Sequence, residues 1–177
     1  PKDDYSIEMY MRAIDFITES LNIDSMFIAG NSYGGYLSWN YANHQPEKVK
    51  KLILIDAAGY QVDGFEDLGF KLMSNPNTSF LATSFTPKAI MKKSILNVYG
   101  NEELVNDELV TRYYDLLLRK GNREGFAKIL QDQRDWSSLN SKIKQVEQPT
   151  LIIWGSEDII LPINAAHQFH KDIKNSE

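Results

Sequence analysis

Three short apolar runs constrain the fold of this chain more than any other feature. They are Met26–Ala29, Leu52–Ile55 and Leu151–Trp154. Parallel strands that are buried between helices have continuous apolar sequences of this kind, and they need a crossover segment between them. The sequence therefore predicts an α/β fold, in which a partial parallel sheet carries helices on both faces.

Helical patterns flank these runs. Before the first run, apolar residues recur three and four positions apart, at Ile7, Tyr10, Ile14, Ile17 and Leu21, which is typical of an amphipathic helix. Ser6 is a suitable N-cap. Further helices are predicted over residues 33–44 and 162–173. The order of helix and strand is that of a helix-covered parallel sheet.

Residues 60–148 interrupt this alternation with helical signals only. Thr86 followed by Pro87 predicts one helix start, and Asn106 followed by two acidic residues predicts another. We therefore expect three segments: residues 1–59 as part of an α/β core, residues 60–148 as a helical lid or cap, and residues 149–177 as a core strand and helix.

Composition excludes several classes of function. The 177 residues carry a formal charge of −5, which disfavours nucleic-acid binding because that requires clustered basic side chains. There is no cysteine for disulfides or thiolate metal sites, and no apolar run approaches the roughly 20 residues of a membrane span. His167 and His170, one helical turn apart, have no third ligand, so we expect no metal and no cofactor. These features favour the cytoplasm without fixing the compartment.

The first apolar run leads directly into the motif Gly30-Asn31-Ser32-Tyr33-Gly34, which has the pattern G-x-S-x-G. In this pattern a serine lies on a sharp strand-to-helix turn, where its neighbours must be small. A strand before the motif and a helix after it are both predicted. The motif therefore indicates a nucleophile elbow with Ser32 as the nucleophile.

Two backbone features would assist that serine. Gly35 would let the new helix approach the following strand closely. The turn also places Ser32 at the positive end of a helix dipole, where the backbone N–H of Tyr33 would be one donor of an oxyanion hole.

These segments resemble the α/β-hydrolase fold superfamily, in its serine-hydrolase branch of bacterial esterases and lipases. The likeness rests on residues 5–23, the elbow region 30–59 and the stretch 149–162, together with the helical insertion. It implies that Ser32 is the nucleophile and Asp158 the acid of a Ser-His-Asp triad. Asp56, which follows the second apolar run, is the alternative acid.

The resemblance also implies parts that this sequence lacks. The expected histidine should follow Asp158 by more residues than remain, and His44, His167 and His170 lie on predicted helices elsewhere. The first strands of the family's sheet are missing too. We therefore expect an internal piece of a larger hydrolase that is inactive alone and has an open sheet edge, through which it would self-associate.

The resemblance implies a small-molecule substrate, and three functions remain open. The first is hydrolysis of a carboxylic ester, with Phe70, Leu72 and Phe80 as candidates to line an acyl pocket in the lid. The second is hydrolysis of a C–C bond in ring-fission products, since Asn31 in the elbow is similar to that group of enzymes. The third is a catalytically inactive hydrolase-like binding module.

Overall fold

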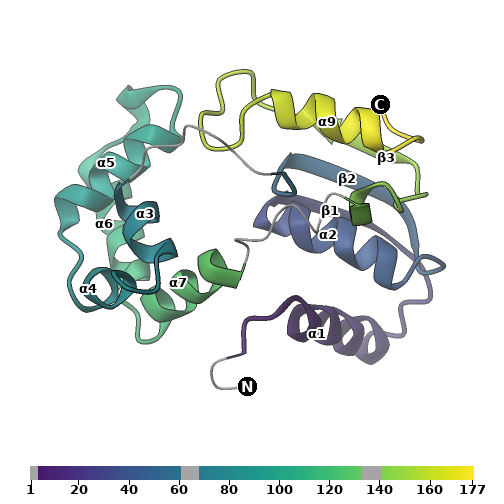
Figure 1. Cartoon of the computed structure of the whole chain (residues 1–177), viewed down its shortest axis with the longest axis horizontal. Coiled ribbons are helices and arrows are strands. Elements are labelled where there is room, and N and C mark those ends of the chain that lie inside the picture. The colour runs from purple at the N-terminus through teal and green to yellow at the C-terminus, as the bar shows by residue number, and fades with distance from the viewer. Residues whose placement is uncertain (1–3, 61–67, 133–140) are drawn as a thin grey trace. The chain divides into compact units, whose positions relative to one another are not determined.

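The computed structural model describes residues 4–60, 68–132 and 141–177, and Figure 1 shows the order of its elements. The chain divides into two compact units. The sheet unit comprises residues 6–62 and 135–177, and the helical unit comprises residues 1–5 and 63–134.

The sheet unit is built on three parallel strands in the order β1-β2-β3. Their bounds are Met26–Ser32 for β1, Val49–Ala57 for β2 and Thr150–Ile153 for β3. Leu54 in the central strand is paired with Gly30 on one side and with Ile152 on the other. The parallel sheet that the apolar runs predict is confirmed.

Helices α2 (Tyr33–His44) and α9 (Asn164–Asp172) pack against these strands, and α1 (Ile7–Ser20) packs against α2. The hydroxyl oxygen of Ser6 accepts the backbone N–H of Met9 at 3.3 Å, so the predicted N-cap of α1 is confirmed. Helix α2 begins at the residue after β1 ends, without an intervening loop. That junction forms the sharp turn that the elbow motif predicts.

The core of the sheet unit lies against one face of the sheet. Leu52 and Leu54 point to that face and are fully buried with Trp39 of α2 and Phe169 of α9. Side chains alternate along a strand, so neighbouring residues point to the opposite face.

On that opposite face the apolar side chains are partly open. Phe27 is 68% exposed, Leu151 39% and Ile153 47%, and none of the three belongs to the core cluster. Helices on this second face, which we also expected from the apolar runs, are not seen in the described part of the chain. One side of the sheet unit therefore presents an apolar surface.

The two edges of the sheet differ. Among the described residues no strand pairs with the outer side of β1. At the other edge, the N–H of Thr150 donates to the carbonyl of Asn175 at 2.9 Å, and the N–H of Glu177 donates back to Thr150 at 3.0 Å. Self-association through the open β1 edge stays a prediction.

The helical unit has no strands among its described residues. Its elements are α3 (Leu68–Ser74), α4 (Ser79–Ser84), α5 (Lys88–Val98), the 3₁₀ turn η1 (Glu102–Leu104), α6 (Asp107–Leu117) and α7 (Asn122–Asp132). The side chain of Asn106 caps α6 as predicted. Thr86 does not cap α5, because its hydroxyl instead donates to the carbonyl of Ala82 at 2.6 Å.

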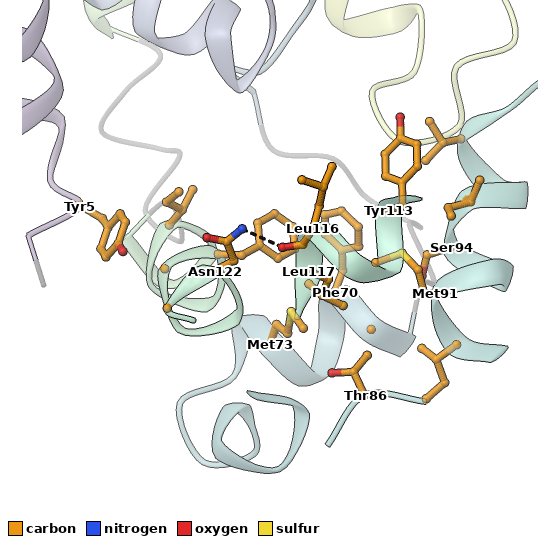
Figure 2. A pocket seen from close by; sticks show the side chains of 18 of the residues that line it. Tyr5, Phe70, Met73, Thr86, Met91, Ser94, Tyr113, Leu116, Leu117 and Asn122 are labelled. Atoms are coloured by element: carbon orange, nitrogen blue, oxygen red, sulfur yellow. Dashed lines mark hydrogen bonds between the residues drawn. The ribbon is translucent and has the colours of Figure 1, made fainter. Parts of the chain in front are cut away.

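A cavity of about 560 Å³ lies within the helical unit, and Figure 2 shows side chains from several helices around it. Of the three residues expected to line an acyl pocket, Phe70 lines this cavity. Leu72 packs instead on the small core around Met73, and Phe80 is 61% exposed. No helix within the described ranges is long and apolar enough to cross a membrane.

Candidate active site

Ser32 lies at the junction of β1 and α2 in a backbone conformation that L-amino acids rarely adopt. Its φ is 54° and its ψ is −120°. Its side chain is exposed and makes no capping bond to α2. Such strain persists only where the surrounding structure fixes it, and it is concentrated at functional sites. The hydroxyl of Ser32 is therefore presented outward at the positive end of a helix.

The backbone around Ser32 is held from the neighbouring strand. The carbonyl oxygen of Ser32 accepts the N–H of Ala58 at 3.0 Å. The side-chain amide of Asn31 donates to the carbonyl of Ile55 at 3.1 Å. In this structure Asn31 thus joins the end of β1 to β2, which is a positioning contact for the elbow.

Space is restricted at two of the three glycines around Ser32, so the expectation that small residues are required there does not hold for Gly34. A Cβ on Gly30 would collide with the backbone of Gly34, and one on Gly35 would collide with Ala57 of β2. The close approach expected at Gly35 is thus seen. Gly34 itself has open space where a Cβ would lie.

Tyr33 is the first residue of α2, and the first backbone N–H groups of a helix have no carbonyl acceptor within that helix. Its ring stacks on Tyr36 with centroids 5.5 Å apart and meets the edge of Tyr10 at the same distance. These ring contacts fix the residue that follows Ser32. The role of the Tyr33 backbone N–H as a donor of the oxyanion hole stays a prediction.

The two candidate acids both lie beside Gly155, close to the carboxyl end of the sheet. Oδ1 of Asp56 accepts the N–H of Gly155 at 2.7 Å, and a Cβ built on Gly155 would be 3.9 Å from the Cβ of Asp158. Asp56 has a φ of 42° and lies at the irregularity between the pairs Asn31–Ile55 and Ser32–Ala57. Asp56 therefore links the end of β2 to the loop after β3 through this hydrogen bond, a contact that the sequence did not indicate.

Asp158 uses only one of its carboxylate oxygens. Oδ1 accepts the N–H groups of Ile160 and Leu161, at 2.8 and 2.9 Å. Oδ2 accepts no hydrogen bond from the described residues, and the side chain is half-buried. The loop thus orients the carboxylate through one oxygen and leaves the other for a further donor.

The three histidines lie within the described residues, and none is hydrogen-bonded to Ser32 or Asp158. His44 ends α2, whereas Ser32 precedes its first residue, so at 1.5 Å of rise per residue about 18 Å of helix separates them. His170 contacts Ser176 at 3.1 Å, and His167 is exposed on α9. The structure brings no histidine of this chain to the elbow.

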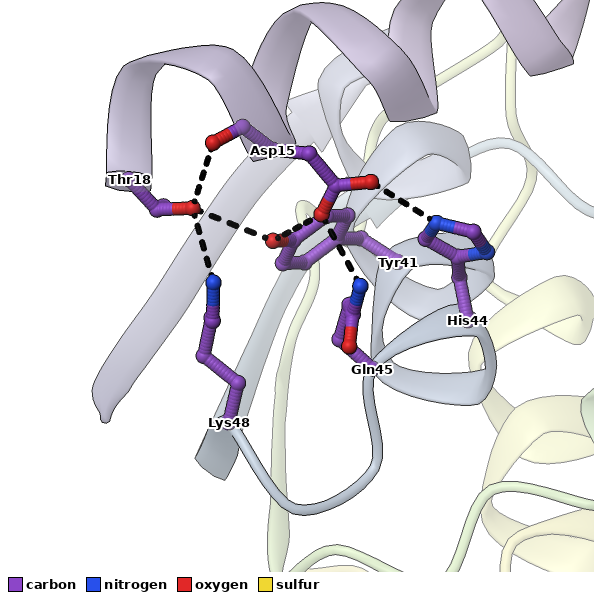
Figure 3. A network of polar contacts seen from close by, with 6 residues as sticks. All are labelled: Asp15, Thr18, Tyr41, His44, Gln45 and Lys48. Carbon is purple, nitrogen blue, oxygen red and sulfur yellow. Dashed lines mark hydrogen bonds and ion pairs between the residues drawn. The ribbon is translucent and has the colours of Figure 1, made fainter. Parts of the chain in front are cut away.

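His44 instead belongs to a polar network between α1 and α2 (Figure 3). Its Nε2 lies 2.9 Å from Oδ2 of Asp15, whose Oδ1 accepts from Tyr41 at 2.9 Å and from Gln45 at 3.0 Å. Burial raises the pKa of Asp15, but the bonds from His44, Tyr41 and Gln45 outweigh it, and the pKa is lowered overall. The helix-end position predicted for His44 is confirmed, and its partner is an acid rather than the helix dipole alone.

A parallel sheet with a serine at a strained strand-to-helix turn defines a class of protein, the α/β hydrolases. The family model for the alpha/beta hydrolase fold matches residues 1–177. The chain belongs to this family.

Three similar proteins have names that state what they hydrolyse. The chain is 30% identical over 169 residues to a 2-hydroxymuconate semialdehyde hydrolase of Pseudomonas putida, covering 91% of this chain and 56% of that protein. It is 25% identical to a 2-hydroxy-6-oxo-2,4-heptadienoate hydrolase of Pseudomonas putida, covering 98% and 61%. Its structure is similar to a meta-cleavage product hydrolase from Pseudomonas fluorescens IP01, with a TM-score of 0.81, 27% identity, and coverage of 100% and 64%.

The chain thus spans a little over half of the length of these relatives. Their names point to C–C bond hydrolases more than to esterases or lipases.

Proposed function

We propose that the protein is a serine hydrolase that cleaves a C–C bond in ring-fission products of aromatic compounds. The observation that supports the serine chemistry is the strained, exposed Ser32 at the start of α2. Support for the bond comes from the relatives, which are named for the semialdehyde, heptadienoate and meta-cleavage products. Carboxylic ester hydrolysis, the first expectation from the sequence, lacks comparable support.

In this proposal, Ser32 Oγ attacks the ketone or aldehyde carbonyl of the substrate and loses its proton to a histidine. Before this attack the enol of the substrate becomes a ketone, as its hydroxyl loses a proton and the carbon beside the attacked carbonyl gains one. The C–C bond to that carbon then breaks, its electron pair spreads into the conjugated keto acid as a dienolate, and the dienolate oxygen takes up a proton. Water then cleaves the acyl-serine ester, which regenerates the hydroxyl and releases a second carboxylic acid (or formate from an aldehyde). The overall reaction adds one water across one C–C bond.

Each supporting residue has a proposed role. The N–H of Tyr33 and the dipole of α2 would stabilise the oxyanion at the attacked carbonyl. Oδ2 of Asp158 would receive the N–H of the histidine and stabilise its charged form. Because His44, His167 and His170 lie elsewhere, we propose that the base comes from the part of the relatives' length that this chain does not span.

The test uses the protein that carries this chain at its natural length. Consumption of 2-hydroxy-6-oxo-2,4-heptadienoate should be followed by absorbance, with p-nitrophenyl acetate as the ester comparison. We expect faster turnover of the dienoate, and a fall of about 10³-fold or more in kcat/KM for Ser32→Ala. Ser20→Ala, at an exposed serine that ends α1, is the matched control and should leave the rate unchanged.

The remaining outcomes decide between the alternatives. Turnover of the ester alone would replace the C–C reaction with ester hydrolysis. Turnover that survives Ser32→Ala would overturn the assignment of the nucleophile. Absence of turnover of both compounds, together with no labelling of Ser32 by a fluorophosphonate, would favour the inactive binding module.

A further inference from the structure

The indole N–H of Trp39 binds the backbone segment that holds the candidate nucleophile. Nε1 of Trp39, in α2, donates to the carbonyl of Ala58 at 3.0 Å. The N–H of Ala58 in turn donates to the carbonyl of Ser32, also at 3.0 Å. Both polar backbone groups of Ala58 are thus engaged, one by the indole and the other by the residue with the strained backbone.

Trp154 has the same relation to the candidate acid. It is the first residue after β3, and its Nε1 donates to the carbonyl of Leu161 at 2.6 Å. The N–H of Leu161 donates to Oδ1 of Asp158 at 2.9 Å. The indole therefore joins the two ends of the loop that contains Asp158.

Packing fixes the orientation of both indoles. Trp39 is fully buried, and its ring meets Tyr36 edge to face with centroids 5.3 Å apart. Trp154 is partly buried and packs at 6.0 Å against Phe169, which is fully buried. Because each ring is held by its neighbours, each N–H directs its carbonyl acceptor to one position.

A tryptophan supplies more than apolar volume at these two places. A phenylalanine would also fill apolar space, whereas a buried indole N–H needs an acceptor. Each indole takes as its acceptor the carbonyl of the residue whose own N–H binds the nucleophile or the acid. Reactive groups depend on such supporting contacts, because a displacement of about 1 Å can lower a rate by about 10²-fold.

We propose that Trp39 is a positioning residue for the nucleophile and that Trp154 is a positioning residue for the acid. Both roles rest on the proposed function, in which Ser32 attacks and Asp158 stabilises the histidine cation. The two tryptophans then affect the reaction differently. Loss of the Trp154 contact would lower the pKa of the histidine, whereas loss of the Trp39 contact would leave that pKa unchanged.

The rate at which a fluorophosphonate labels Ser32 tests both roles, in the protein that carries this chain at its natural length. We expect Trp39→Phe to lower the second-order rate constant of labelling by about tenfold or more at every pH. Trp154→Phe should also lower this rate constant. In addition, it should shift the acidic limb of the pH profile by about 0.5 unit or more toward lower pH, because the histidine cation is less stabilised.

Tyr41→Phe is the matched control for Trp39→Phe. Tyr41 is a fully buried ring of the same helix, and its hydroxyl donates to Asp15 instead of to backbone that holds Ser32. This variant loses a hydrogen bond, so urea unfolding should show that it is destabilised while its rate constant of labelling stays unchanged. An effect of weaker folding alone would appear in this control as well.

Circular dichroism establishes that each variant is folded. Where a phenylalanine variant does not fold, 3-benzothienylalanine at the same position decides the matter, because it keeps the two fused rings and has sulfur in place of the N–H. Labelling of both tryptophan variants at the rate of the unaltered protein would overturn both positioning roles, and an unshifted pH profile for Trp154→Phe would overturn that of Trp154. Absence of labelling of the unaltered protein would overturn the proposed nucleophile as well, so the two failures are distinguished.

Discussion

Oδ1 of Asp56 accepts the backbone N–H of Gly155 across the carboxyl end of the sheet, at 2.7 Å. Gly155 lies in the loop that carries Asp158, so one candidate acid holds the segment that contains the other. The two carboxylates are distinguished by their bonds: Asp56 fastens a strand to a loop, whereas Asp158 keeps Oδ2 without a donor among the described residues. This difference assigns the structural role to Asp56 and leaves Asp158 as the better candidate for the triad.

Exchange of each acid for its amide tests this assignment. In the protein of natural length, we expect Asp158→Asn to lower kcat/KM by about 10⁴-fold, because an amide cannot stabilise a histidine cation. Asp56→Asn keeps an oxygen for Gly155, so it should destabilise folding by only about 1 kcal/mol and change kcat/KM by less than about tenfold. Steady-state kinetics and urea unfolding give the two quantities. A larger catalytic loss for Asp56→Asn would reverse the assignment.

Gly35 and Gly34 give a paired prediction about the elbow. A Cβ on Gly35 would collide with Ala57, so we expect Gly35→Ala to lower the free energy of unfolding by about 1–3 kcal/mol through overpacking. Gly34 has open space within helix α2, so Gly34→Ala should raise it by up to about 1 kcal/mol, since alanine is the better helix former.

Chemical denaturation of both variants measures this difference. Ala57→Gly in the background of Gly35→Ala supplies the control, because it removes the atom that the new methyl group meets. We expect the double variant to recover part of the lost stability. If Gly34→Ala proves as destabilising as Gly35→Ala, the contact with Ala57 is not the reason for the glycine.

The sequence predicts the sheet unit well because its signals are local. The apolar runs predict the strands, Ser6 caps α1, and the turn from β1 to α2 leaves no room for a Cβ at Gly30 or Gly35. Thr86 shows the limit of such signals. Its hydroxyl has an alternative acceptor in the carbonyl of Ala82, which only the preceding helix places within reach.

Contacts between distant segments could not be predicted from local patterns. The bond from Asp56 to Gly155 joins residues 99 positions apart, and the pair of Asp15 with His44 joins two helices. The open face of the sheet was also unexpected, because a continuous apolar run such as Leu52–Ile55 does not say whether both of its faces are covered. That face is defined by exposed side chains such as Phe27 and Ile153.

The polar network around Asp15 predicts that the free energy of unfolding decreases at acidic pH. The lowered pKa of Asp15 means that its charged form is favoured by folding. Its contribution is therefore full above the unfolded pKa of about 3.9 and is lost as the pH falls through the lower folded value. At pH 7 we expect Asp15→Asn to reduce the free energy of unfolding by about 1–2 kcal/mol, because the bonds from His44, Tyr41 and Gln45 lose a charged acceptor.

Urea unfolding from pH 7 to pH 2 follows this contribution. The difference between the unaltered chain and Asp15→Asn should shrink as the pH falls below about 4. Asp24→Asn, at an exposed acid of the same unit, is the control and should show no such difference at any pH. A difference that stays constant with pH would mean that the charge of Asp15 is not what joins α1 to α2.

The buried hydroxyl of Tyr60 predicts a loss of stability at high pH. Its hydroxyl donates to Oδ2 of Asp172 at 3.1 Å, and burial followed by the charge of Asp172 raises the pKa of Tyr60. Folding therefore favours the neutral phenol. The stability that it contributes is present below the unfolded pKa of about 10 and is lost as the pH rises above that value.

We expect Tyr60→Phe to lower the free energy of unfolding by about 1–3 kcal/mol at pH 7, because the buried Asp172 loses a donor. The free energy of unfolding of this variant should also depend less on pH between about 10 and 12. Equal alkaline sensitivity of Tyr60→Phe and the unaltered chain would exclude Tyr60 as its source.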